Sequence, residues 1–212
     1  MDVLEAVLLG VPVTLLVTVL AFALGAVLAV PLAAARRSRV TPVRWLGRVV
    51  IDVVRGIPPV VWLFLIFFGL GRDLIRLEPI EAGVIGLGII SAGYLAEIYR
   101  GGLSAVHRGQ WEAASALGMG GSDTLVRIVA PQAFRVSLPA ATTYAISLLK
   151  DSTIVSAIGV TEILFRATQS ARSMGAGLTP FFVAAAVYIL LSAPLAWLSR
   201  GLDARLRARV AR

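Results

Sequence analysis

The chain has 212 residues, of which 58% are hydrophobic and only 15% charged, and its formal net charge is +8. This composition excludes an ordinary soluble domain, which carries more charge, and indicates one integral membrane domain over residues 1–212. With no cysteine and only one histidine, His107, disulfides, thiolate metal sites and multi-histidine metal sites are excluded. The positive charge is typical of arginines at the cytosolic ends of membrane helices, so we expect no nucleic-acid partner.

The first predicted element is a membrane helix over residues 7–35, where no residue is charged. About 20 helical residues are enough to cross the ~30 Å hydrocarbon core of a bilayer. The acidic start, with Asp2 and Glu5, is unlike a cleavable signal peptide, so we expect this helix to be retained. The arginine cluster of residues 36–48 then indicates a cytosolic loop, with the N-terminus outside.

Four further spans are predicted, over residues 50–71, 82–100, 124–149 and 176–199. The apolar runs in the three middle spans are short, and by periodicity alone they also fit buried helices of a soluble protein. Charge decides between these interpretations, because five spans place the basic segments 36–48, 100–127 and 200–212 on one side. The expected fold class is therefore an all-α integral membrane protein with five transmembrane helices. Its C-terminus is cytosolic, and the arginine-rich tail is expected to contact lipid headgroups.

Small residues recur at four-residue spacing in two of the predicted spans. They are Gly25, Ala29 and Ala33 in the first span, and Gly88 and Ala92 in the third. Such spacing allows two membrane helices to approach closely. Glycine is also common in membrane helices generally, so close packing and simple composition both remain open.

A polar segment from Gly109 to Gly118, with the sequence GQWEAASALG, interrupts the apolar chain. Gly109 as the N-cap, Glu112 in the first turn and Gly118 after the last predict a short cytosolic helix. Trp111, Ala114 or Ser115, and Gly118 share one face of that helix. One large side chain among small ones suits a groove in a partner protein. A helix that lies on the membrane surface is the alternative.

This segment resembles the cytosolic motif of the permease subunits of ATP-binding-cassette (ABC) importers. That motif reads Glu-Ala-Ala, three residues, Gly, nine residues, Ile, one residue, Leu-Pro. Its counterpart here is Glu112-Ala113-Ala114, Gly118, Ile128 and Pro131, with Ala130 in place of the leucine. Three more segments are similar to hallmarks of the polar-amino-acid branch of that family: RGIPPVVWLF from Arg55, GYLAEIYRGGL from Gly93 and LLKDSTIVSAIGVTE from Leu148. The resemblance covers the chain from Thr14 to about Arg205.

The resemblance implies the fold of a type I importer permease in the cytoplasmic (inner) membrane of a bacterium. It implies a second permease subunit, identical or different, a separate ATPase that binds ATP and Mg²⁺, and an extracytoplasmic binding protein that delivers an amino acid. This chain would then hold no cofactor and would not be an enzyme. A channel or scaffold subunit without ATP coupling is the alternative. An intramembrane enzyme would need a nucleophile–base pair or a metal cluster.

The resemblance also assigns roles to particular residues. The expected ATPase-coupling residues are Gly109, Gln110, Trp111, Glu112, Ala113, Ala114 and Gly118. Ionisable residues at membrane depth are costly and usually functional, and Glu162 belongs to this group. The candidates for the substrate pathway are Tyr94, Glu97, Asp151, Ser152 and Thr153. Structural roles are expected for Arg55, Arg100 and Lys150, and a pair between Glu97 and Arg100 is the structural alternative to a pathway role for Glu97.

Overall fold

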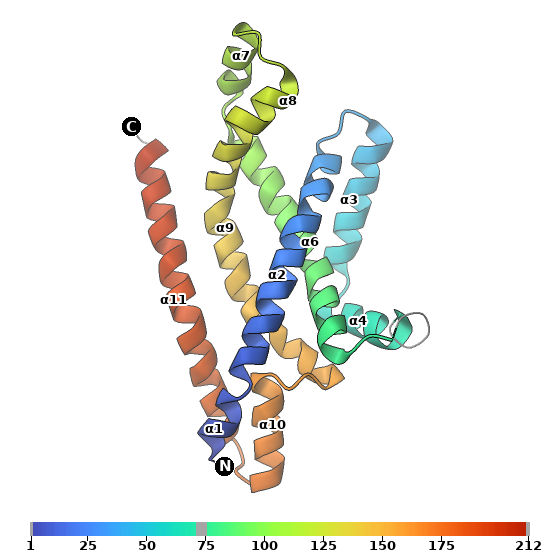
Figure 1. Ribbon diagram of the computed structural model, residues 1–212, viewed down its shortest axis with the longest axis vertical. Helices are drawn as coiled ribbons and strands as arrows, with labels where there is room; N and C mark the ends of the chain where they lie inside the picture. Colours follow the sequence, from blue (N-terminus) through green and yellow to red (C-terminus); the bar gives the residue numbers. More distant parts are fainter. Residues whose placement is uncertain (1, 71–75, 211–212) are drawn as a thin grey trace.

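The computed structural model describes residues 2–70 and 76–210, and these residues form an elongated bundle of helices in which no strand occurs (Figure 1). The α-helices are α1 (Val3–Leu8), α2 (Val11–Arg36), α3 (Thr41–Gly56), α4 (Pro59–Phe64), α6 (Pro79–Ala105), α7 (Arg108–Ala116), α8 (Gly121–Thr124), α9 (Ala130–Asp151), α10 (Ile163–Met174) and α11 (Thr179–Val210). Two π-helical segments, Leu65–Leu70 and Leu125–Val129, and a 3-10 helix, Ser152–Ile158, join them. The all-α fold class is confirmed.

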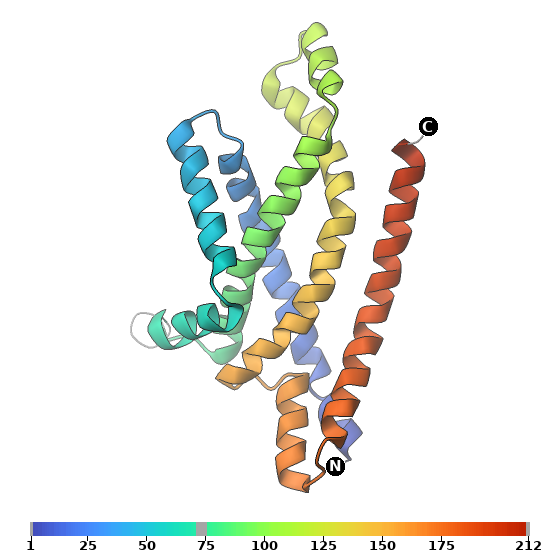
Figure 2. The same cartoon turned by 180° about the vertical axis from the view of Figure 1, so that it is seen from behind.

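The two ends of the bundle differ in what they contain. The loop after α2, helix α7 and the last turns of α11 lie at one end, which we call the α7 end, and the N-terminus and α10 lie at the other (Figures 1 and 2). The described parts of the three basic segments therefore gather at the α7 end of the bundle. Arg212 and the side chains of Arg205, Arg207 and Arg209 lie outside the described part of the structure.

Three stretches in the described chain are long and apolar enough to cross a membrane unaided: Val3–Arg36, Pro79–Ala105 and Thr179–Gly201. They match the first, third and fifth predicted spans. The fourth predicted span, 124–149, corresponds to α9 together with the helical segments that precede it. That pass carries Arg135 and Lys150 and an internal proline, Pro139, which explains its weaker apolar signal.

The second predicted span, 50–71, is not one helix, and its last residue lies outside the described residues. The chain instead makes α3 and then α4, and the helices on either side of Ile57-Pro58 are bent by 98°. Pro58 and Pro59 lack N–H donors, and a proline disfavours helical backbone at the residue before it, so α3 ends here. The indole N–H of Trp62 donates to the carbonyl of Val54 at 3.1 Å, which satisfies an acceptor freed by the bend.

Helices α2 and α6 share the most extensive interface in the described chain. Ala29 is fully buried there, and a Cβ built on Gly25 would lie 2.3 Å from Cβ of Ser91. A Cβ built on Gly88 would lie 2.6 Å from Cδ2 of Leu24. Real Cβ atoms do not come so close to other carbon atoms, so the predicted close packing is confirmed.

Gly25→Ala is expected to lower the melting temperature of the purified protein. The added Cβ would also lie 3.0 Å from the backbone N of Ala92, and overpacking of this kind costs ~1–3 kcal/mol. Gly101→Ala is the control, because no atom lies within 4 Å of a Cβ built on Gly101 in α6. It should be neutral or slightly stabilising. The melting temperature is measured as the loss of the size-exclusion peak after heating. Equal melting temperatures for both variants would contradict the tight interface.

A buried carboxylate organises the end of the bundle opposite α7. Glu162 is 0% exposed and is the N-cap of α10. It accepts hydrogen bonds from the backbone N–H groups of Leu164 at 2.8 Å and Phe165 at 2.7 Å. The hydroxyl of Tyr188 in α11 donates to the same carboxylate at 2.7 Å. Glu162 therefore joins α10 to α11.

Candidate functional site

The GQWEAASALG segment forms α7, as predicted, at one tip of the bundle (Figure 1). The helix begins slightly earlier than expected, because the N-cap is His107 and not Gly109. Nδ1 of His107 accepts the N–H of Gly109 at 3.0 Å. Gly118 has a φ of +73°, so the predicted end in left-handed backbone is confirmed. Two backbone bonds close this end, from Gly118 to Ser115 and from Met119 to Ala114, each of 3.0 Å.

The orientation of α7 differs from the expected one. Ala114 is 1% exposed and Trp111 is half-buried against a cavity in the chain's own surface. The expected docking face, with Trp111 as its anchor, is therefore turned toward the rest of the chain, because there the indole buries its large apolar area. The exposed residues of α7 and its C-cap include Glu112, Ala113, Ala116 and Leu117. Leu117, at 80% exposed, is the large apolar side chain on this outer face.

Helix α7 is tied to the long helix α9. Nε2 of Gln132 donates both to Oε1 of Gln110 at 3.2 Å and to the carbonyl of Ile128 at 3.0 Å. The motif also contains an ion pair, Arg108 with Glu112 at 3.3 Å, but this pair is well exposed and contributes little to stability. Gln110 is therefore the residue through which the motif holds α9.

Glu97 lies in an ion-pair cluster between α2 and α6. Oε1 of Glu97 is 3.1 Å from Nε of Arg36, and Oε2 is 2.8 Å from the guanidinium of Arg100. The side chains of Glu97 and Arg36 are only 18% and 15% exposed. Both carboxylate oxygens are engaged, which favours the structural alternative for Glu97. The sequence did not identify Arg36 as the partner of Glu97, because its place in a basic cluster indicates only the side of the membrane.

A cationic and aromatic cluster joins α3, α6 and α9. Cζ of Arg55 lies 4.9 Å from the ring centroid of Tyr94, within the range of a cation–π interaction. The rings of Tyr94 and Tyr144 stack with centroids 5.2 Å apart. The hydroxyl of Tyr144 donates to Oγ of Ser91 at 3.0 Å. Within the part of the chain that the structure describes, Arg55 has no carboxylate within salt-bridge distance.

The remaining pathway candidates lie where α9 ends. Asp151 and Lys150 are exposed, whereas Ser152 is fully buried and donates its hydroxyl to a carbonyl of α9 at 2.7 Å. Thr153 donates to the carbonyl of Lys150 at 2.8 Å. Asp151 and Tyr144 are seven residues apart, so they share a face of α9 about 10 Å apart along its axis. Of the five candidates, Tyr94 belongs to the Arg55 cluster, and Asp151 lies on the same face of α9 as Tyr144, about two helical turns away.

Comparison with known proteins gives the family of the chain. The profile of the family described as binding-protein-dependent transport system inner membrane component matches residues 21–208. The L-cystine transport system permease protein TcyB of Bacillus subtilis (strain 168) is 37% identical, over 96% of this chain and 87% of its own length. The arginine transport system permease protein ArtQ of the same organism is 32% identical, over 95% of this chain and 93% of its own.

Solved structures agree with this result. One solved structure is that of an amino acid ABC transporter crystallised with histidines. A chain of that transporter superposes on the present chain with a TM-score of 0.87 at 32% identity, and the match covers 97% of the present chain and 99% of the transporter chain. A chain of the MetNI methionine ABC transporter superposes with a TM-score of 0.79 at 20% identity, over 96% of each chain, and supports the fold alone. The chain therefore belongs to the binding-protein-dependent transport system inner membrane component family, and it is a permease subunit of an ABC importer and not an enzyme.

Proposed function

We propose that this permease carries an amino acid, together with a second permease subunit, in a type I importer. An extracytoplasmic binding protein delivers the substrate, and a separate ATPase that binds ATP and Mg²⁺ drives its transfer. Relatives named for the transport of L-cystine, arginine and glutamine support amino acids as the substrate class. Since these substrates differ widely in charge, what they share is the zwitterionic α-amino and carboxylate group.

In chain order, the five passes of the proposed topology are α1 with α2, α3, α6, α8 with α9, and α11. The N-terminus lies outside, and the α7 end, with the C-terminus, lies in the cytosol of a bacterial cell. The gathering of the basic segments at the α7 end supports this orientation. The arginine-rich tail lies against the lipid headgroups of that side.

The outer face of α7 docks into the ATPase. An apolar side chain as exposed as that of Leu117 on a short polar helix is typical of a surface that a partner covers. Trp111 and Ala114 hold the inner face of α7 on the permease, and Gln110 connects it to α9. When the ATPases close, α7 moves as a rigid body and α9 moves with it, which changes access to the pathway.

The substrate pathway passes the Arg55–Tyr94–Tyr144 cluster, and this cluster is the observation that carries the proposal. Arg55 was expected to be structural, but a guanidinium without a carboxylate neighbour is suited to the carboxylate of an amino acid. Asp151, on the same face of α9 as Tyr144, is suited to the ammonium group. Arg100 keeps its structural role beside Glu97, whereas the structural role of Lys150 stays a prediction.

Arg55→Gln and Asp151→Asn are expected to raise the KM for uptake by roughly tenfold or more, because each removes a charge-assisted hydrogen bond to the substrate. The substrate is first identified as the amino acid that most stabilises the cognate binding protein in a thermal-shift panel. Uptake is then measured in proteoliposomes that contain the complete importer. Asp123→Asn, at the α7 end, removes a carboxylate of the same type and should leave KM unchanged.

The possible results of this uptake experiment distinguish a wrong assignment of the pathway residues from a wrong function. An unchanged KM in both variants would remove Arg55 and Asp151 from the pathway. If the wild-type importer accumulated no amino acid although its binding protein bound one, the proposed function itself would be wrong.

A further inference from the structure

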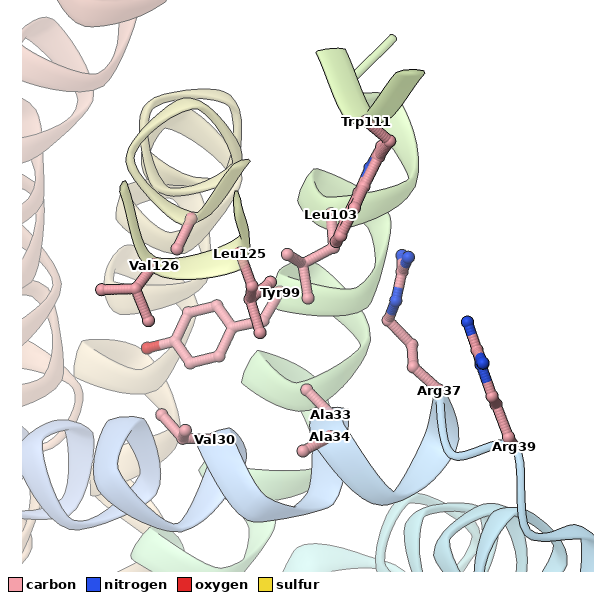
Figure 3. Close-up of a pocket in the computed structure, with 11 residues that line it drawn as sticks. Val30, Ala33, Ala34, Arg37, Arg39, Tyr99, Leu103, Trp111, Leu125 and Val126 are labelled. Carbon is pink, nitrogen blue, oxygen red and sulfur yellow. The ribbon is translucent and has the colours of Figure 1, made fainter. Parts of the chain in front are cut away.

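A cavity of about 680 Å³ opens at the α7 end, between α2, α6, α7 and the helical segment that leads into α9 (Figure 3). Its volume lies within the ~300–1,000 Å³ of ordinary small-molecule sites. The wall is almost entirely apolar, and it includes Val30, Ala34, Leu103, Trp111, Leu125 and Val126. The cavity thus offers few hydrogen-bonding groups to a polar ligand.

A second apolar cavity, of about 320 Å³, continues the first along the bundle. The two share the side chains of Val30, Tyr99 and Leu103, and the second extends along α9 to Phe134. Phe134 is 62% exposed, so this continuation opens on the side of the bundle. Together the cavities form an elongated apolar groove, which we call the α2–α9 groove.

One edge of the α2–α9 groove is cationic. Arg37 and Arg39 are the charged residues among its described lining, and Figure 3 shows both side chains on the same side as Trp111. Both arginines are exposed. Arg37 has one polar side-chain contact, with Oγ of Ser104 at 3.4 Å. Neither takes part in the four salt bridges of the described residues, which are those of Glu97, Glu112 and Asp123.

We propose that the α2–α9 groove binds an anionic phospholipid of the cytosolic leaflet, with its phosphate on Arg37 and Arg39 and an acyl chain among the apolar side chains. This inference rests on the proposed function, because the orientation given there puts the α7 end at the cytosolic membrane surface. An amino acid or a nucleotide would leave polar groups unpaired in such a groove. A free anion would use the arginines and leave the apolar wall in water. An anionic amphiphile matches both parts.

The bound lipid has a mechanical consequence, because Trp111 of α7 forms part of the wall. An acyl chain beside the indole fills the space under α7 and holds that helix in its docked position on the bundle. Anionic lipid is therefore expected to stabilise the importer and to raise ATP hydrolysis that is coupled to uptake. The composition of the leaflet would then regulate coupling without any contact with the substrate.

The test uses the complete importer, purified in neutral detergent and titrated with phosphatidylglycerol, phosphatidylcholine or inorganic phosphate, with the melting temperature as readout. Phosphatidylglycerol alone should raise the melting temperature of the wild type. In Arg37→Gln/Arg39→Gln the apparent affinity for phosphatidylglycerol should fall roughly 10- to 30-fold. Ala34→Phe, which fills the groove without a change of charge, should abolish the shift.

Two matched controls lie outside the groove. Arg44→Gln/Arg48→Gln removes two exposed charges of the same basic segment at positions in α3, and Ala23→Phe adds the same bulk at an exposed position earlier in α2. Both should keep the wild-type response to phosphatidylglycerol. An equal response in all variants would overturn the proposal in favour of unspecific contact with lipid. An equal response to phosphatidylcholine or to phosphate would overturn it as well, since only one part of the amphiphile would then matter.

A protein in the groove is the remaining alternative. If Ala34→Phe released the ATPase while phosphatidylglycerol had no effect on the wild type, the groove would be a protein-docking site and the lipid proposal would be wrong. A wild type that takes up an amino acid but whose melting temperature does not respond to phosphatidylglycerol would reject the lipid site and leave the proposed function intact. Failure of all uptake with an intact, groove-dependent lipid response would reject the proposed function instead.

Discussion

Gly118→Ala is expected to uncouple ATP hydrolysis from amino acid uptake, and Gly118→Val to do so more completely. With a φ of +73°, the position costs an L-residue roughly 1–2 kcal/mol. No atom lies within 4 Å of a Cβ built on Gly118, so the effect comes from the backbone and not from a steric clash. The backbone bonds that close α7 orient Leu117, and a loss of this size lowers the population of the docked geometry roughly 5- to 30-fold.

Gly121→Ala is the matched control for this prediction. A Cβ built on Gly121 also meets no atom within 4 Å, but its φ is not positive. Co-purification of the ATPase and the ratio of uptake to ATP hydrolysis in proteoliposomes should therefore be unchanged in Gly121→Ala and reduced in Gly118→Ala. If the two variants behaved alike, the left-handed end of α7 would have no part in coupling.

The parts of the fold that depend on local pattern were predictable from the sequence. Long uncharged runs predict the first and last spans, the shorter apolar run within 82–100 predicts the third, and the glycine after α7 predicts where that helix ends. The break between α3 and α4 was not predicted, because α3 is amphipathic and its charged residues, such as Arg48 and Asp52, resemble those of a loop. The predicted span 50–71 therefore joined the last turns of α3 to the apolar run after Pro58, although the helices on either side are bent by 98°.

The site depends on contacts that no local pattern contains. Arg36 and Glu97 are 61 residues apart in the sequence, and nothing near either residue identifies the other as its partner. Similarly, helical spacing places Trp111 and Ala114 on one face but does not say which face the rest of the chain covers. The structure turns the face of Trp111 and Ala114 toward the rest of the chain and leaves Leu117 exposed.

Glu162→Ala is expected to destabilise the folded permease by ~2–4 kcal/mol, because two backbone donors of α10 lose their cap and a buried tyrosine hydroxyl loses its acceptor. The backbone at the start of α10 is also packed closely against α2. The N–H of Ile163 is already bonded to Oγ1 of Thr14 at 3.3 Å, and a Cβ built on Gly10 would lie 2.5 Å from the same nitrogen. The start of α10 is thus held between α2 and α11.

A graded series of variants tests this account of Glu162. Tyr188→Phe removes a single donor and should cost ~0.5–1.5 kcal/mol. Glu162→Gln should fall between Tyr188→Phe and Glu162→Ala, because it keeps one acceptor oxygen but turns an amide NH₂ toward a donor. Glu5→Ala removes another helix-capping carboxylate, which accepts the N–H of Asp2 at 3.3 Å in an exposed position, and it should change the melting temperature least. If Glu5→Ala and Glu162→Ala lowered the melting temperature equally, burial of the Glu162 carboxylate would contribute nothing, and α10 would be held by its apolar contacts alone.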